Sequence, residues 1–186
     1  MRIACVATQG FEDHELSEPI EALRQAGHQV EVIAPHRDPI AGYHEAVRVR
    51  PSDTIDEANP EDYDALLIPG GYSPDQLRAD ERFIRFAQAF RNKPVFAICH
   101  GPQLLLAAGM LDGRRVTAWR TVQDDLLRAG IEVYDQEVVV DGNLVTSRQP
   151  GDIPAFSRAI VEVLEKGVGY VPAGAEPGVP VGASIH

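Results

Sequence analysis

The sequence is poor in cysteine, in long apolar runs and in positive charge. Two cysteines, Cys5 and Cys99, are too few for a disulfide framework, and they favour a reducing compartment. No stretch approaches the roughly 18 apolar residues of a membrane-spanning helix, and the apolar N-terminal run is too short for a signal peptide. The formal net charge of −11 disfavours nucleic-acid and anionic-membrane partners. We therefore expect a cytoplasmic protein that binds neither.

Signals for a metal or a cofactor are also missing from the sequence. None of the six histidines pairs with another ligand at a spacing typical of zinc. No glycine-rich phosphate-binding motif follows a predicted strand. We predict that the protein uses no metal and no cofactor.

The chain of 186 residues has the periodicity of an α/β domain. Short apolar strands alternate with amphipathic helices through the first 110 residues, which favours a parallel sheet covered on both faces. The predicted strands are residues 3–7, 30–34, 65–68 and 95–98, with a hairpin at 138–140 and 144–146. The predicted helices are residues 13–26, 81–91, 102–108 and 153–166. Pro19 should kink the first of them.

We expect one domain over residues 1–166 and a tail over residues 167–186. The tail holds five glycines and three prolines and has no lysine or arginine, so it cannot form a core of its own. If it is ordered, it packs against its own domain or against a neighbouring chain.

The strongest chemical signal is Cys99, which follows a buried strand directly. Gly101 permits a tight turn and Pro102 suits the first position of a helix, so the segment has the features of a nucleophile elbow. The positive end of the helix dipole should favour the Cys99 thiolate and lower its pKa. Cys5 lies inside the first strand, and we interpret it as a core residue.

Two further segments follow strands that should end at the same edge of the sheet. Gly70 and Gly71 could present backbone N–H groups to a substrate oxygen, although such a pair can equally be a structural turn. A carboxylate of residues 10–15 could reach Cys99. From spacing alone, Glu12 and Asp13 more simply favour the start of the helix.

Four segments together resemble the PfpI family of the class I glutamine-amidotransferase-like superfamily. They are Phe11-Glu12-Asp13, Pro69-Gly70-Gly71, Ala97-Ile98-Cys99-His100-Gly101-Pro102-Gln103 and Val138-Val139-Val140-Asp141-Gly142-Asn143. The resemblance extends from about residue 1 to residue 166. It implies a flavodoxin-like three-layer sandwich with a mostly parallel central sheet.

The resemblance also implies roles for the residues that match. Cys99 is then the nucleophile, Glu12 the carboxyl that contacts its sulfur, and His100 the adjacent imidazole. Gly70 and Gly71 are then the oxyanion donors, and Trp119 is an aromatic residue near the pocket. In PfpI-type peptidases a glutamate of the neighbouring subunit orients the histidine. The matching residue here is Asp75, one methylene shorter, and its position predicts a homodimer or a higher homo-oligomer.

The sequence argues against an amidotransferase triad within one chain, because no histidine lies between His100 and His186. Three functions remain open. The first is a stress-protective cysteine-dependent hydrolase or lyase that acts on reactive carbonyls such as methylglyoxal, or on their protein adducts, as deglycases and glyoxalases do. The second is an intracellular cysteine peptidase. The third is a redox sensor or chaperone in which Cys99 is oxidised.

Overall fold

A seven-stranded sheet forms the centre of the protein. The computed structural model describes residues 1–182, and within them the strand order is β10-β11-β7-β6-β1-β2-β5. All neighbouring strands of this sheet are parallel except β10 and β11, which form an antiparallel hairpin. The strands are β1 (Arg2–Val6), β2 (Gln29–Ala34), β5 (Asp53–Thr54), β6 (Ala65–Ile68), β7 (Val95–Ile98), β10 (Val138–Asp141) and β11 (Leu144–Ser147).

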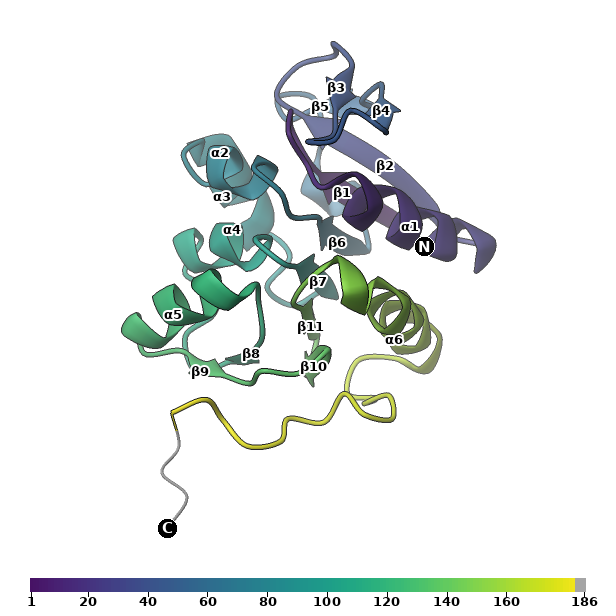
Figure 1. Ribbon diagram of the computed structural model, residues 1–186. Helices are drawn as coiled ribbons and strands as arrows, with labels where there is room; N and C mark the ends of the chain where they lie inside the picture. Colours follow the sequence, from purple (N-terminus) through teal and green to yellow (C-terminus); the bar gives the residue numbers. More distant parts are fainter. Residues whose placement is uncertain (183–186) are drawn as a thin grey trace.

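Helices cover both faces of the sheet (Figure 1). On one face α1 (Asp13–Gln25) packs against α6 (Ile153–Lys166), over a core that includes Ile3 and Cys5 of β1. The opposite core includes Ala4 and Val6 of the same strand. Since successive side chains of a strand point to opposite faces, these two cores lie on opposite sides of the sheet. The helices on the second side are α2 (Ser73–Leu77), α3 (Glu81–Gln88), α4 (Pro102–Ala107) and α5 (Arg120–Arg128).

The predicted three-layer α/β sandwich is thus confirmed, and the long elements lie where the sequence places them. The α1 helix continues through Pro19, at position seven of thirteen. The sequence pattern did not predict α2, α5 or two short β pairs, and the β pairs carry too few residues for a periodic signal. Those pairs are β3 (Ile40–Ala41) with β4 (Arg48–Val49) and β8 (Arg115–Val116) with β9 (Glu132–Val133), and the 3-10 turns η1 (Pro60–Asp62) and η2 (Pro150–Asp152) were also missed. No helix in the described part of the chain is long and apolar enough to cross a membrane.

The described part of the tail packs against its own domain. It runs past β10, the edge strand of the sheet (Figure 1). The backbone N–H of Val140 donates to the carbonyl of Ala175 at 3.0 Å, and the N–H of Val181 donates to the carbonyl of Val133 at 2.7 Å. The buried Ala175 joins the core beside α6. The tail therefore occupies hydrogen-bonding groups of an edge strand that would otherwise face solvent.

The Gln136 side chain clamps this tail with both ends of its amide. Its Nε2 donates to the carbonyl of Glu176 at 2.9 Å and its Oε1 accepts from the N–H of Gly178 at 3.0 Å. We expect Gln136→Ala to destabilise the docked tail by about 1–2 kcal/mol, since it removes both bonds. Proteinase K should then cut within residues 167–182 several-fold faster than in wild type, as followed by mass spectrometry.

A matched control is Gln25→Ala, which removes an exposed amide that bonds to Glu21. This variant should leave the rate of cutting in the tail unchanged. Equal cutting in both variants and in wild type would mean that the clamp contributes nothing to docking.

Candidate active site

Cys99 lies at the turn between β7 and α4, as the elbow pattern predicts. Its φ of 64° is in the left-handed region, which is costly for a residue other than glycine. Two backbone bonds hold the turn: the N–H of Cys99 donates to Ser147 at 2.9 Å, and its carbonyl accepts from Trp119 at 3.0 Å. The side chain is 5% exposed. Neighbouring segments thus hold the sulfur at the carboxyl edge of the sheet in a strained backbone conformation.

The carboxyl beside this sulfur belongs to Glu15, whereas the family resemblance implied Glu12 in that place. Glu15 is fully buried in the first turn of α1, and its Oε1 accepts from the N–H of Gly70 at 3.0 Å. Glu12 precedes the helix and its carboxylate accepts from the N–H of Glu15 at 2.8 Å. Glu12 is therefore the N-cap of α1, and one turn of helix points Glu15 inward.

Burial and, to a smaller extent, the nearby charge of Glu12 raise the pKa of Glu15 to about 8. The thiol of Cys99 and the N–H of Gly70 oppose this shift. Glu15 Oε2 is buried and has no hydrogen-bond partner among the described residues. At neutral pH the carboxyl therefore holds a proton for much of the time.

The backbone donors near the sulfur are the N–H groups of Gly71 and His100, and both lower the pKa of the Cys99 thiol. The predicted pair was Gly70 and Gly71. The N–H of Gly70 instead donates to Glu15, so it is not free for an oxyanion. A side chain at position 70 would place its Cβ 2.4 Å from Glu15 Oε1 and 2.8 Å from the Cys99 Cβ. Glycine at this position lets the carboxyl and the cysteine meet.

The prediction of a lowered Cys99 pKa is contradicted by the surroundings of the sulfur. Burial raises the pKa of the Cys99 thiol, and the carboxylate of Glu15 raises it further. These effects outweigh the two backbone N–H groups. α4 is only six residues long, so its dipole adds little. Burial also raises the pKa of Cys5 to about 12, and this residue is fully buried in the core as expected.

His100 and Trp119 form one wall of the site. His100 Nδ1 lies 3.3 Å from Cys99 Sγ, and its ring stacks on the Trp119 indole with centroids 6.1 Å apart. Burial lowers the pKa of His100, so its imidazole is neutral at neutral pH. A neutral imidazole at this distance can accept the proton of the thiol.

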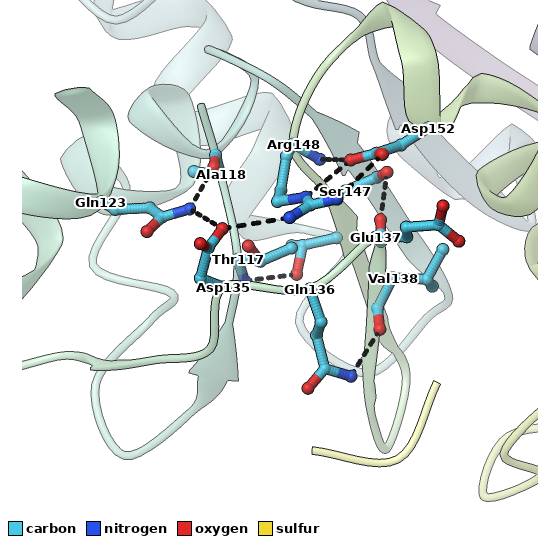
Figure 2. A network of polar contacts seen from close by, with 11 residues as sticks. Thr117, Ala118, Gln123, Asp135, Gln136, Glu137, Val138, Ser147, Arg148 and Asp152 are labelled. Carbon is cyan, nitrogen blue, oxygen red and sulfur yellow. Dashed lines mark hydrogen bonds and ion pairs between the residues drawn. The ribbon is translucent and has the colours of Figure 1, made fainter. Parts of the chain in front are cut away.

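A polar network fixes the segment that carries Trp119 (Figure 2). Gln123, one turn into α5, donates to the carbonyl of Ala118 at 2.9 Å and to Asp135 at 3.1 Å. Arg148 donates to Asp135 at 3.2 Å and to both carboxylate oxygens of the buried Asp152. The network ties α5 to the segment after β11, so the indole has a rigid support.

Asp75 does not reach His100 within the chain. Its carboxylate lies on α2 and pairs with Arg78 at 2.7 Å, and its side chain is exposed. Its charge still raises the pKa of His100, although burial of the imidazole prevails. Asp75 thus lies near the site and faces outward.

The site opens into a cavity of about 360 Å³ at the carboxyl edge of the sheet. The lining contains the predicted Glu12, Gly71, Cys99, His100 and Trp119, and also Glu15, which lies in the acidic segment 10–15 but was given no role of its own. The remaining lining residues carried no signal in the sequence: Tyr43, His44, Tyr72 and Pro150. A signal for Glu15 exists in the sequence. Glu15, Pro19 and Leu23 follow at intervals of four on the buried side of α1, so Glu15 is an acidic residue in an apolar stripe.

Three comparisons with known proteins found relatives of this chain. Residues 1–163 match the profile described as the DJ-1/PfpI family. General stress protein 18 of Bacillus subtilis is 51% identical over 89% of this chain and 98% of its own length. Protein/nucleic acid deglycase 2 of Escherichia coli is 48% identical over 88% of this chain and 97% of its own. The ThiJ/PfpI domain protein of Brachyspira murdochii superposes with a TM-score of 0.84 at 25% identity, over 89% and 97% of the two chains.

Proposed function

Because the chain belongs to the DJ-1/PfpI family, we propose that it is a stress-protective, cysteine-dependent enzyme that cleaves adducts of reactive carbonyls. The observation that carries the proposal is the grouping of one thiol, one raised-pKa carboxyl and one neutral imidazole around a single cavity. Relatives named as a general stress protein and as a deglycase support this substrate class.

In the proposed reaction Cys99 Sγ adds to the carbonyl carbon of the adduct. The thiol proton passes to His100 Nδ1, or is already shared with Glu15, so that the sulfur attacks as an anion. A C–S bond forms, and the former carbonyl oxygen takes the negative charge. The N–H groups of Gly71 and His100 point at the sulfur and lie where they can bond that oxygen.

The neighbouring carbinol carbon of the adduct carries the amine and a hydroxyl. Its C–N bond breaks as the protonated Glu15 carboxyl gives its proton to the nitrogen, and the hydroxyl becomes a carbonyl and returns its proton to Glu15. The oxyanion then re-forms its C=O bond, the C–S bond breaks, and the sulfur takes its proton back, so that the free amine and the dicarbonyl leave.

The proposal is tested with methylglyoxal adducts of N-acetylarginine, N-acetyllysine and N-acetylcysteine. Proton NMR follows adduct decay in phosphate buffer, with free methylglyoxal and casein assayed in parallel. We expect decay faster than the spontaneous dissociation of each adduct. If only free methylglyoxal is consumed, the enzyme is a glyoxalase, and if only casein is cleaved, it is a peptidase. Inert behaviour towards all of these leaves the redox-sensor reading.

We also propose that two chains assemble so that Asp75 of one reaches the site of the other. Its exposed carboxylate on α2, beside the His100 wall, supports this arrangement. Asp75→Asn should then lower kcat/KM by about tenfold or more without changing the unfolding temperature, because loss of an orienting carboxylate is costly. Glu81→Gln, an exposed acid on α3, is the control. Light scattering should give a multiple of 20.3 kDa, and a monomer would remove this role for Asp75.

A further inference from the structure

Asp13 is a fully buried carboxylate for which the proposed reaction has no use. It is the first residue of α1, two positions before Glu15. Three backbone N–H groups donate to it, each at 2.8 Å: His44 to Oδ2, and Ala46 and Val47 to Oδ1. A buried charge with three charge-assisted bonds is expensive to expose or to leave unpaired. This contact therefore ties two distant segments together.

The donors belong to the tip of the β3–β4 hairpin, residues 42–47. Its backbone wraps closely around the carboxylate. A Cβ at Gly42 would lie 2.3 Å from the Asp13 Cγ, and Glu45 adopts a left-handed φ of 58°. The N–H of Tyr43 also donates to the carbonyl of Phe11, at 2.7 Å. Within the tip the N–H of Gly42 donates to Val47 and the N–H of Glu45 donates to Gly42, each at 2.9 Å, so the tip closes on itself around the Asp13 carboxylate.

The same tip carries one wall of the cavity. Tyr43 and His44 line it, and the Tyr43 ring meets the Tyr72 ring edge to face with centroids 5.0 Å apart. Tyr43 and Tyr72 are 54% and 60% exposed, so little packing holds these rings in place. The position of this wall therefore depends on the backbone of the tip, which the three bonds to Asp13 tie to α1.

We infer that Asp13 is a positioning residue, which holds the hairpin tip so that Tyr43 and His44 form a substrate-facing wall of the cavity. This inference rests on the proposed function, because it takes the cavity as the substrate site. Asp13 acts on binding, through the tip, and it leaves the chemistry at Cys99 to Glu15 and His100. Burial alone would raise the pKa of Asp13, yet the N–H groups of His44, Val47 and Ala46 keep that pKa below its ordinary value of 3.8. The Asp13 carboxylate is therefore charged at neutral pH. We call its three bonds to the N–H groups of residues 44, 46 and 47 the Asp13 latch.

The latch is tested first by amide hydrogen exchange, which needs no turnover. In Asp13→Asn an NH₂ group replaces one carboxylate oxygen, and this group cannot accept a hydrogen bond from the backbone N–H groups of the tip. The amides of His44, Ala46 and Val47 should therefore exchange at least about tenfold faster than in wild type. Gly42→Ala keeps the charge of the carboxylate but displaces it, because the added methyl group would clash with it. This variant should speed exchange of the same amides as Asp13→Asn does. Glu18→Gln, an exposed acid on α1, is the control. Unchanged exchange at the tip in both variants, with cooperative unfolding retained, overturns the latch.

Positioning is tested by kinetics on the best adduct substrate. Asp13→Asn should raise KM about tenfold with kcat within about threefold of wild type. In a Tyr43→Ala, His44→Ala background the same substitution should change KM less than about twofold, because the wall it positions is gone. An undiminished effect in that background, or a fall in kcat alone, overturns the inference.

A third readout separates this inference from the proposed function. If the wild type turns over no adduct, the proposed function fails, and alkylation of Cys99 by iodoacetamide replaces the kinetics. A loosened wall should then speed alkylation at least about threefold in Asp13→Asn but not in Glu18→Gln. Equal alkylation rates in wild type and in both variants would count against a positioning role for Asp13.

Discussion

Replacing Cys99 with serine is expected to lower kcat/KM for adduct cleavage by about three orders of magnitude or more. Loss of a nucleophile whose neighbours act with it as a unit removes nearly all of the chemical rate enhancement. The smaller hydroxyl fits the turn, and its proton is far harder to remove than that of a thiol. Adduct decay followed by NMR in the same buffer measures the effect.

The fold should survive this substitution, because serine keeps the backbone bonds of Cys99 to Ser147 and Trp119. Cys5→Ser is the matched control for chemistry. It should retain turnover while losing stability, since it places a hydroxyl in a fully buried core site. If Cys99→Ser retained turnover within tenfold of wild type, the reaction would not pass through this sulfur.

Glu15→Gln is expected to have the second largest effect, a loss of about 10²- to 10³-fold in kcat/KM. Glutamine keeps an oxygen for the N–H of Gly70, which bonds to Glu15 Oε1 at 3.0 Å, but it cannot take up or release a proton. In wild type the rate should fall as the pH rises through about 8, where the Glu15 carboxyl ionises. The variant should lose that limb of the pH profile.

The same substitution has a signature in stability. The pKa of Glu15 is about 8 in the folded chain against an ordinary value of 4.5, so the folded state binds the extra proton between these pH values. The free energy of unfolding of wild type should therefore fall as the pH rises from about 4.5 to about 8. The stabilisation that comes from the extra proton on Glu15 is fully present only below about 4.5. Chemical denaturation of Glu15→Gln across this range should show a flatter dependence.

Glu12→Gln decides between the two carboxyls. It keeps an acceptor for the N–H of Glu15 at the helix cap, so its kcat/KM should fall by less than about tenfold. A larger loss for Glu12→Gln than for Glu15→Gln would return the catalytic role to Glu12, as the family resemblance first suggested.

Local chemistry of the chain was enough to predict most of the fold. The alternation of apolar strands with helices predicts the parallel sheet, since each strand must be covered on both faces. The run from Val95 to Pro102 predicts the elbow at Cys99, because a buried strand, a glycine and a proline leave few conformations for the turn. The family resemblance, which the profile match confirms, predicted His100 and Trp119 as site residues, and both line the cavity.

Only the tertiary structure decided which groups meet at Cys99. Whether Glu12 or Glu15 faces the sulfur depends on where α1 begins and on how that helix is rotated against the sheet. The carboxyl of Glu15 also decides which backbone N–H group stays available at residues 70 and 71, because it accepts the N–H of Gly70. The raised thiol pKa follows from burial, a property of the packed chain that no local pattern reports. The Asp13 latch joins residues more than thirty positions apart. The sequence by itself therefore determined the turn at Cys99, and packing determined which groups surround it.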